Sequence, residues 1–181
     1  MSGADPTGQD RASAGADPAP AGLAEASDDV KRLYAYWLAR RGGKRFPARE
    51  DIDPVDFKFA LGRVSLIDVL EDPRRYRYRL VSTSTTKHLG YEMTGKFTEE
   101  IPEKELRDHL ERLYAETVSS TGPIYTKEKA VFDGRLWESE ALMLPLSSDG
   151  RRINMIMAFR ETAAPRSALG GAPAPKATGD R

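Results

Sequence analysis

The clearest alternation of apolar and charged positions along the chain is the stretch YRYRL. Tyr76, Tyr78 and Leu80 alternate with arginines, and this period of two predicts a strand with one apolar and one cationic face. Residues 64–70 before it are apolar at most positions, which is typical of a central strand covered on both faces. Between them, residues 71–74 carry turn chemistry that includes a proline. The pattern therefore predicts a hairpin that forms the first half of a sheet.

Helical spacing of apolar residues is found on both sides of this hairpin. An N-cap at Ser27, two acidic residues after it and a glycine pair at the other end predict a helix over residues 28–41. A longer helix is expected from Pro102 to a stop at Gly122, with Leu113 in its buried stripe. Shorter helices are expected over residues 54–61 and 83–89.

The last part of the ordered region returns to alternation. Three more strands are predicted over residues 123–132, 136–146 and 153–160, and the turn sequences DG and SSDG separate them. Two groups of strands thus flank a helical segment. This order of elements predicts an α+β fold, in which an antiparallel sheet has its helices gathered on one face.

Composition divides the chain of 181 residues into one domain and two tails. Residues 1–26 and 162–181 are rich in small residues and proline, so we expect them to be disordered and to leave a single domain over residues 27–161. The 28 basic and 28 acidic residues cancel, which gives no general electrostatic reason to bind nucleic acid or an acidic membrane surface. No apolar run has the length of a membrane span and the N-terminus lacks the pattern of a secretory signal, so a cytoplasmic protein is expected.

Three stretches carry a family resemblance: YWLARRGGKRFPAREDIDPVDF, RVSLIDVLEDPRRYRYRLVSTSTTKHLGYEMTGK and ALMLPLSSDGRRINMIMAF. Their order resembles the small single-domain bacterial members of the PAS domain family, over residues 28–161. The resemblance implies a five-stranded antiparallel sheet in the order 2-1-5-4-3, with short helices and one longer helix across one face. It also implies a role in sensing or protein contact, and it supplies no catalytic residue.

Little in the sequence suggests catalysis or a bound cofactor. The absence of cysteine excludes thiolate metal sites and a cysteinyl–flavin adduct. Because some PAS domains hold haem through a histidine of the long helix, the resemblance makes His109 a candidate haem ligand, although a partly exposed helix residue is the preferred interpretation. His88 is expected to be a cation at the end of a helix. With no phosphate-binding loop, nucleophilic triad or acid–base pair in view, an enzyme is not expected.

The face of the sheet under the helices is a candidate ligand space. Its aromatic rings, methionines and hydroxyls suit a small organic ligand, and they suit an ordinary filled core equally well. The candidate residues are Tyr76, Tyr78, Leu80, His109, Leu110, Leu113, Trp137, Ser139, Ala141, Met143, Met155 and Met157. The predicted function is a non-catalytic sensor or regulatory domain that acts through a small ligand, another signalling protein, or both. A ligand-free interaction module and a haem sensor using His109 remain the alternatives.

The opposite face of the sheet also carries apolar residues at its centre, which predicts that something covers it. These residues are Ile67, Val69, Leu142, Leu144, Ile156 and Ala158. The first predicted helix has an apolar stripe that consists of Val30, Leu33, Tyr34, Trp37 and Leu38. We expect this stripe to pack on the sheet, within its own subunit or by exchange in a homodimer. The arginines of the YRYRL strand are expected to protect a sheet edge from aggregation.

Overall fold

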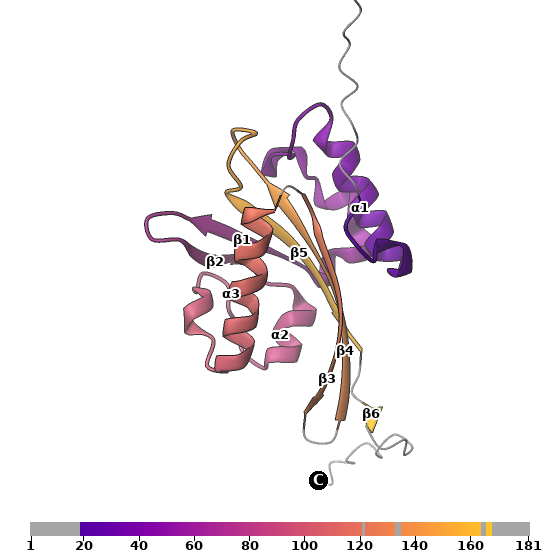
Figure 1. Cartoon of the computed structure of the whole chain (residues 1–181), viewed down its shortest axis with the longest axis vertical. Helices are drawn as coiled ribbons and strands as arrows, with labels where there is room; N and C mark the ends of the chain where they lie inside the picture. The colour runs from indigo at the N-terminus through magenta and orange to yellow at the C-terminus, as the bar shows by residue number, and fades with distance from the viewer. Residues whose placement is uncertain (1–18, 121, 133–134, 164–165, 168–181) are drawn as a thin grey trace, which may run out of the picture.

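A twisted antiparallel sheet separates two groups of helices (Figure 1). The computed structural model describes residues 19–120, 122–132, 135–163 and 166–167. Within them the sheet has the order β2-β1-β5-β4-β3, which confirms the expected topology. The strands are β1 (Val64–Leu70), β2 (Arg75–Leu80), β3 (Ile124–Phe132), β4 (Arg135–Leu146), β5 (Met155–Thr162) and a short β6 (Arg166–Ser167), which pairs with β4.

The helices begin and end largely where the sequence signals lie. The α-helices are α1 (Asp28–Arg41), α2 (Thr83–Leu89) and α3 (Lys104–Ser119), and the 3-10 helices are η1 (Leu23–Glu25), η2 (Arg49–Asp51), η3 (Pro54–Arg63) and η4 (Thr98–Glu100). The hydroxyl of Ser27 accepts a hydrogen bond from the amide of Val30 at 3.4 Å, and Gly42 ends α1 with a φ of 56°. η1 and β6 lie in segments that composition assigned to the tails. Within the described residues, no helix combines the length and apolar character that a membrane span requires.

Helix α1 covers one face of its own sheet. Leu33 and Trp37 are fully buried, and the Nε1 of Trp37 donates a hydrogen bond of 3.0 Å to the carbonyl oxygen of Pro145 in β4. At the start of the helix, the amide of Ser27 donates to the Oε1 of Glu140, also in β4, at 2.8 Å. The expectation that the first helix packs on the sheet is confirmed, and the helix does so within its own subunit.

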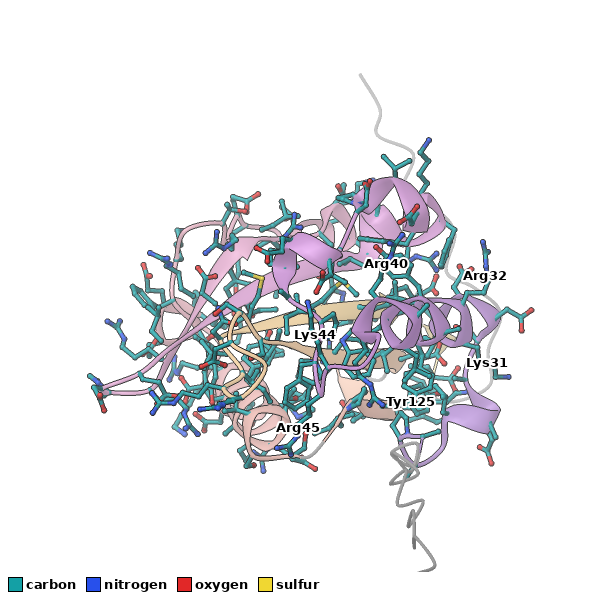
Figure 2. All side chains as sticks on the ribbon, turned by 90° about the horizontal axis from the view of Figure 1, so that it is seen from above. Lys31, Arg32, Arg40, Lys44, Arg45 and Tyr125 are labelled. Atoms are coloured by element: carbon teal, nitrogen blue, oxygen red, sulfur yellow. The ribbon has the colours of Figure 1, made fainter. Side chains whose placement is uncertain are left out.

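The other side of α1 is polar and basic. Lys31, Arg32 and Arg40 are exposed there (Figure 2), and Arg40 forms an ion pair with Asp56 of η3. Leu38, which helical spacing placed in the apolar stripe, is 36% exposed. The buried stripe is therefore narrower than the sequence predicted and ends at Trp37.

Strand pairing shows which side chains share a face of the sheet. Ile67 stands opposite Tyr78 of β2 and Ile156 of β5, and Tyr78 contacts Tyr114 of α3, so these residues lie on the face under α2 and α3. Val69 and Ala158 lie on the same face, because their partners are Tyr76 and Met143. The assignment of four residues to the face under α1 was therefore wrong. These residues are Ile67, Val69, Ile156 and Ala158.

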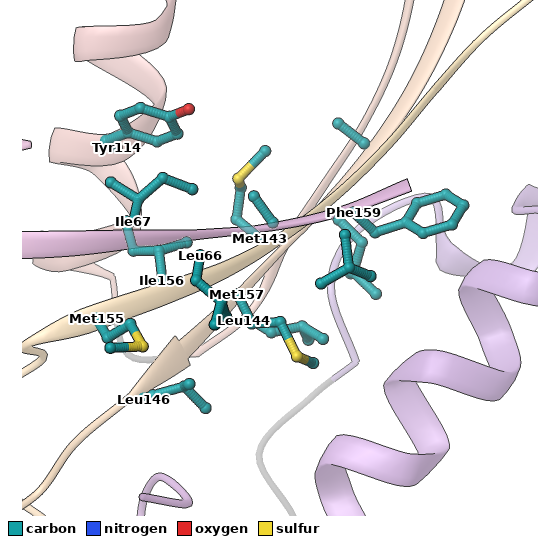
Figure 3. Packing of buried hydrophobic residues seen from close by; sticks show 14 of the residues in the cluster. Leu66, Ile67, Tyr114, Met143, Leu144, Leu146, Met155, Ile156, Met157 and Phe159 are labelled. Atoms are coloured by element: carbon teal, nitrogen blue, oxygen red, sulfur yellow. The ribbon is translucent and has the colours of Figure 1, made fainter. Parts of the chain in front are cut away.

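The methionines of β5 lie on the α1 face instead. Met157 pairs with Leu144 and Met155 with Leu146, and Figure 3 shows these side chains on the opposite side of the strands from Met143. Placing Met155 and Met157 beside the tyrosines of β2 was therefore wrong. β1 and β5 are apolar on both faces, so their pattern does not reveal the register, and a shift of one residue exchanges the two faces.

Leu80 also departs from the expected face. It is 48% exposed rather than buried beside Tyr78. The pairing of β1 with β2 shifts between Leu66 and Ile67, so β2 has one extra residue there. This is a β-bulge, and a bulge changes the direction in which the following side chains point.

Two arginines of β2 converge on a buried carboxylate. Asp68 of β1 is 4% exposed, and it accepts hydrogen bonds from Arg77 Nη2 at 3.0 Å and Arg79 Nε at 2.8 Å. The free edge of β2 is partly covered by the chain, because the amide of Tyr78 donates to the carbonyl oxygen of Lys96 at 2.9 Å. Edge protection therefore comes from backbone pairing as well as from charge.

Candidate functional site

A small cavity lies between the sheet and helices α2 and α3. Its volume is about 70 Å³. Both polar and apolar side chains surround it, and those that line it are Ser65, Tyr78, Ser84, Thr85, His88, Leu89, Leu106, Leu110, Tyr114, Met143, Ala158, Arg160 and Thr162. The sheet supplies the floor, α2 one wall and α3 the other.

A pair of tyrosines forms the most deeply buried polar part of the lining. The hydroxyls of Tyr78 and Tyr114 are 3.0 Å apart and hydrogen-bonded, and the residues are only 3% exposed. The ring of Tyr114 also packs edge-on against Tyr76, with centroids 5.3 Å apart. Burial raises the pKa of both Tyr78 and Tyr114 above the ordinary value, so each stays a neutral hydroxyl at physiological pH.

Arg160 brings a positive charge into the same space. It stands near the end of β5, opposite Ala141 of β4 and two residues after Ala158. Its Nη2 atom is buried and has no hydrogen-bond partner among the described residues. A buried N–H group of an arginine normally has a carboxylate or carbonyl partner, so the Nη2 of Arg160 is unusual.

His88 lies at the mouth of the cavity, on the last turn of α2, and is exposed. The partial loss of solvent around its ring, and then the positive charge of Arg160, lower its pKa below the ordinary value. The sequence assigned His88 the role of a cation at the helix end. The lowered pKa instead favours the neutral imidazole, because the ring is partly shielded from solvent and lies near the positive charge of Arg160.

The cavity brings together only some of the residues that the sequence proposed. Tyr78, Leu110 and Met143 line it. Tyr76 and Leu113 are buried in the surrounding layer but do not reach the cavity, and Ser139 lies opposite Thr162 at its far end. The side chain of Trp137 lies outside the described part of the structure. Met155 and Met157 face α1.

His109 does not fit the role of haem ligand. It does not line the cavity, and its Nε2 lies 3.4 Å from Glu128 Oε2 of β3. A cavity of about 70 Å³ is also far below the roughly 300–1,000 Å³ of sites for drug-sized ligands. The residues present therefore provide neither the space nor the axial position for haem.

Three functional candidates were missed by the sequence reasoning, and two of them had a signal. Tyr114 follows Leu110 by four residues, so helical spacing already places it on the buried face. Arg160 follows Ile156 and Ala158 in the alternation, which puts one charge on an otherwise apolar face. Ser65 had no such signal, since its strand is apolar on both sides.

Comparison with known proteins supports the fold. The model of the PAS domain family matches residues 26–158. No curated protein and no solved structure matches the chain. Within the described residues, no group of three or more acidic or histidine side chains could hold a metal ion. The match to the family model covers well over half of the chain and agrees with the strand order, and the chain therefore belongs to the PAS domain family, whose members are in general sensor or regulatory domains.

Proposed function

We propose that this chain is a non-catalytic sensor, in which a small molecule binds the cavity between the sheet and helices α2 and α3 and thereby changes contact with a partner protein in bacterial signalling. The observation that supports this proposal is the cavity itself. A well-filled core contains few voids larger than a water molecule, and a void that is also lined by hydroxyls and a guanidinium suits a polar occupant.

The size of the cavity limits its occupant. At about 70 Å³, it is roughly half the 150 Å³ of an engineered cavity that holds benzene. A ligand with only a few non-hydrogen atoms fits without rearrangement. A larger ligand requires one wall to move outward.

Helix α2 is the wall best suited to move. It is only seven residues long and contains no fully buried residue, although Ser84, Thr85, His88 and Leu89 line the cavity. Elements with few buried contacts have the lowest cost of local opening. We propose that the ligand sets the position of α2, and that this helix carries the signal to the surface.

The test is a thermal-shift screen of the full chain against small metabolites, followed by native mass spectrometry of the protein as purified. A ligand at a hundred times its dissociation constant is expected to stabilise the fold by about 2.7 kcal/mol. The variant Ala158→Met fills the cavity and is expected to lose this response. Ala115→Met, on α3 outside the cavity, is the matched control and is expected to keep it.

The alternative of a ligand-free interaction module makes the opposite prediction. In that case no compound shifts the unfolding temperature, and Ala158→Met leaves partner binding intact. A screen in which no compound acts on the wild-type chain would therefore contradict the sensor proposal.

A further inference from the structure

We infer that the ligand of the cavity is a short-chain carboxylate, whose anionic group binds Arg160. This inference rests on the proposed function and narrows it to one class of ligand. Three observations support it: a buried guanidinium nitrogen that has no partner among the described residues, a cavity lining without acidic residues, and apolar side chains in the same lining.

Arg160 differs from Arg63, a partly buried arginine that joins distant segments of the chain. Arg63 donates to Asp29 at 2.5 Å and to Glu161 at 2.7 Å, and so its charge is compensated. Arg160 is partly exposed, but its Nη2 is buried and has no hydrogen-bond partner among the described residues. A buried N–H group of a guanidinium that lacks an acceptor costs free energy, and an anion that enters the cavity can accept that hydrogen bond.

The lining of the cavity contains no acidic group that could compensate Arg160. Of the thirteen residues that line the cavity, one is arginine, one is histidine and none is Asp or Glu. The chain as a whole has 28 acidic and 28 basic residues, so this absence is local. Glu161, the next residue in the chain, pairs with Arg63 instead of Arg160. The lining of the cavity therefore carries a net positive formal charge.

The rest of the lining selects among anions. Leu106, Leu110 and Met143 present an apolar surface in the same cavity as Arg160. A carboxylate with a short alkyl chain satisfies both surfaces, because its oxygens can accept two parallel hydrogen bonds from a guanidinium while its carbons contact the leucines. Inorganic phosphate or sulfate has no apolar part and would leave Leu106, Leu110 and Met143 without an apolar contact.

The experiment uses the full chain in a chloride buffer that contains no carboxylate. Acetate, propionate and butyrate are compared with the neutral propionamide and with inorganic phosphate, by thermal shift and by calorimetric titration. We expect propionate or butyrate to bind more tightly than propionamide and phosphate.

Two substitutions connect this binding to Arg160. Arg160→Met keeps the length of the side chain and removes its charge, and the affinity for the carboxylate is expected to fall by at least about tenfold. Arg152→Met removes one exposed positive charge outside the cavity and is expected to leave the affinity unchanged. Without ligand, Arg160→Met is expected to unfold at a temperature no lower than the wild type, because it removes an uncompensated charge.

The outcomes separate this inference from the sensor proposal. If propionamide or another neutral compound binds as well as the carboxylates, or if Arg160→Met leaves carboxylate affinity intact, the inference is overturned and the sensor proposal stands. If phosphate binds more tightly than every carboxylate, the apolar residues of the lining do not contribute to ligand binding, and the inference is also overturned. If no compound of any charge binds the wild-type chain, both fail.

Discussion

The Nε1 of Trp37 in α1 and the carbonyl oxygen of Pro145 in β4 are 3.0 Å apart and hydrogen-bonded. Strand β3 pairs with β4 only as far as Met143, so it does not reach the backbone of Pro145. The indole supplies a donor there, and its ring is fully buried beneath the helix. This one contact joins the N-terminal helix to the sheet by both packing and hydrogen bonding.

We expect Trp37→Phe to lower the free energy of unfolding by about 1–3 kcal/mol, since it leaves a carbonyl without its donor and a space where the indole was. Leu38→Ala, one position along and exposed, is expected to cost about 0.5 kcal/mol or less. Urea denaturation measures both. Equal losses of stability at the two positions would show that the contact of Trp37 with the sheet does not stabilise the packing of α1.

The strands themselves and the identity of the covering helix were predictable from strong local patterns, whereas the strand order was implied only by the resemblance to the PAS domain family. In β2, arginine alternates with tyrosine, so its faces could be assigned, and the stripe that ends at Trp37 has the spacing of one helix face. The faces of β1 and β5 could not be assigned. Both strands are apolar at nearly every position, and only the pairing of Ile67 with Ile156 reveals the register.

The candidate site was less predictable than the fold. Tyr78 was placed on the correct face because its strand alternates clearly, and Met143 because the alternation earlier in its strand, at Glu138 and Glu140, distinguishes the two faces. Arg160 was overlooked because one charge at the end of a strand is usually solvent-exposed. Whether such a residue has a partner depends on the positions of distant carboxylates, and in this chain Glu161 is engaged by Arg63.

The carboxylate of Asp68 gives a prediction about the edge strand. From alternation alone, Arg77→Ala would cost less than about 0.5 kcal/mol, as for a surface residue. Since Asp68 is buried and bonded to both Arg77 and Arg79, we now expect about 1 kcal/mol for Arg77→Ala and about 1–3 kcal/mol for the double alanine variant, by chemical denaturation.

Two variants serve as controls for the Asp68 cluster. Arg75→Ala breaks only an exposed pair with Glu99 and a contact with the ring of Phe97, and is expected to cost under about 1 kcal/mol. Adding Asp68→Val to the double alanine variant removes the uncompensated charge and is expected to restore part of the stability. A further loss on this addition would contradict the assignment.

Asp149, in the turn between β4 and β5, gives a prediction about pH. It accepts hydrogen bonds from the amides of Arg152 and Arg151, both at 2.8 Å, and from the hydroxyl of Ser147, and these bonds lower its pKa to about 2. Because the pKa is lower in the folded state than in the unfolded state, the ionised group stabilises the fold above about pH 4. This contribution is lost as the pH falls from about 4 to about 2.

Asp149→Asn keeps an oxygen acceptor but cannot ionise, so we expect it to be less stable than the wild type at pH 7. The difference is expected to narrow below about pH 4 and to vanish near pH 2, as measured by thermal unfolding over a pH series. A difference that stays constant down to pH 2 would mean that the charge of Asp149 does not stabilise the turn.

The tyrosine pair gives the last prediction, which concerns the wall of the cavity. Tyr78→Ala removes a ring that is 3% exposed and is expected to cost about 3 kcal/mol or more. Tyr78→Phe keeps the ring and removes only the hydrogen bond to the buried Tyr114 hydroxyl, so the free energy of unfolding is expected to fall by about 1 kcal/mol. Tyr91→Phe also loses a single hydroxyl contact, a solvent-exposed hydrogen bond to Glu103, and is expected to cost less than Tyr78→Phe. Chemical denaturation of the three variants measures this order, and an equal cost for the two phenylalanine variants would show that the hydroxyl pair adds no stability to the cavity wall.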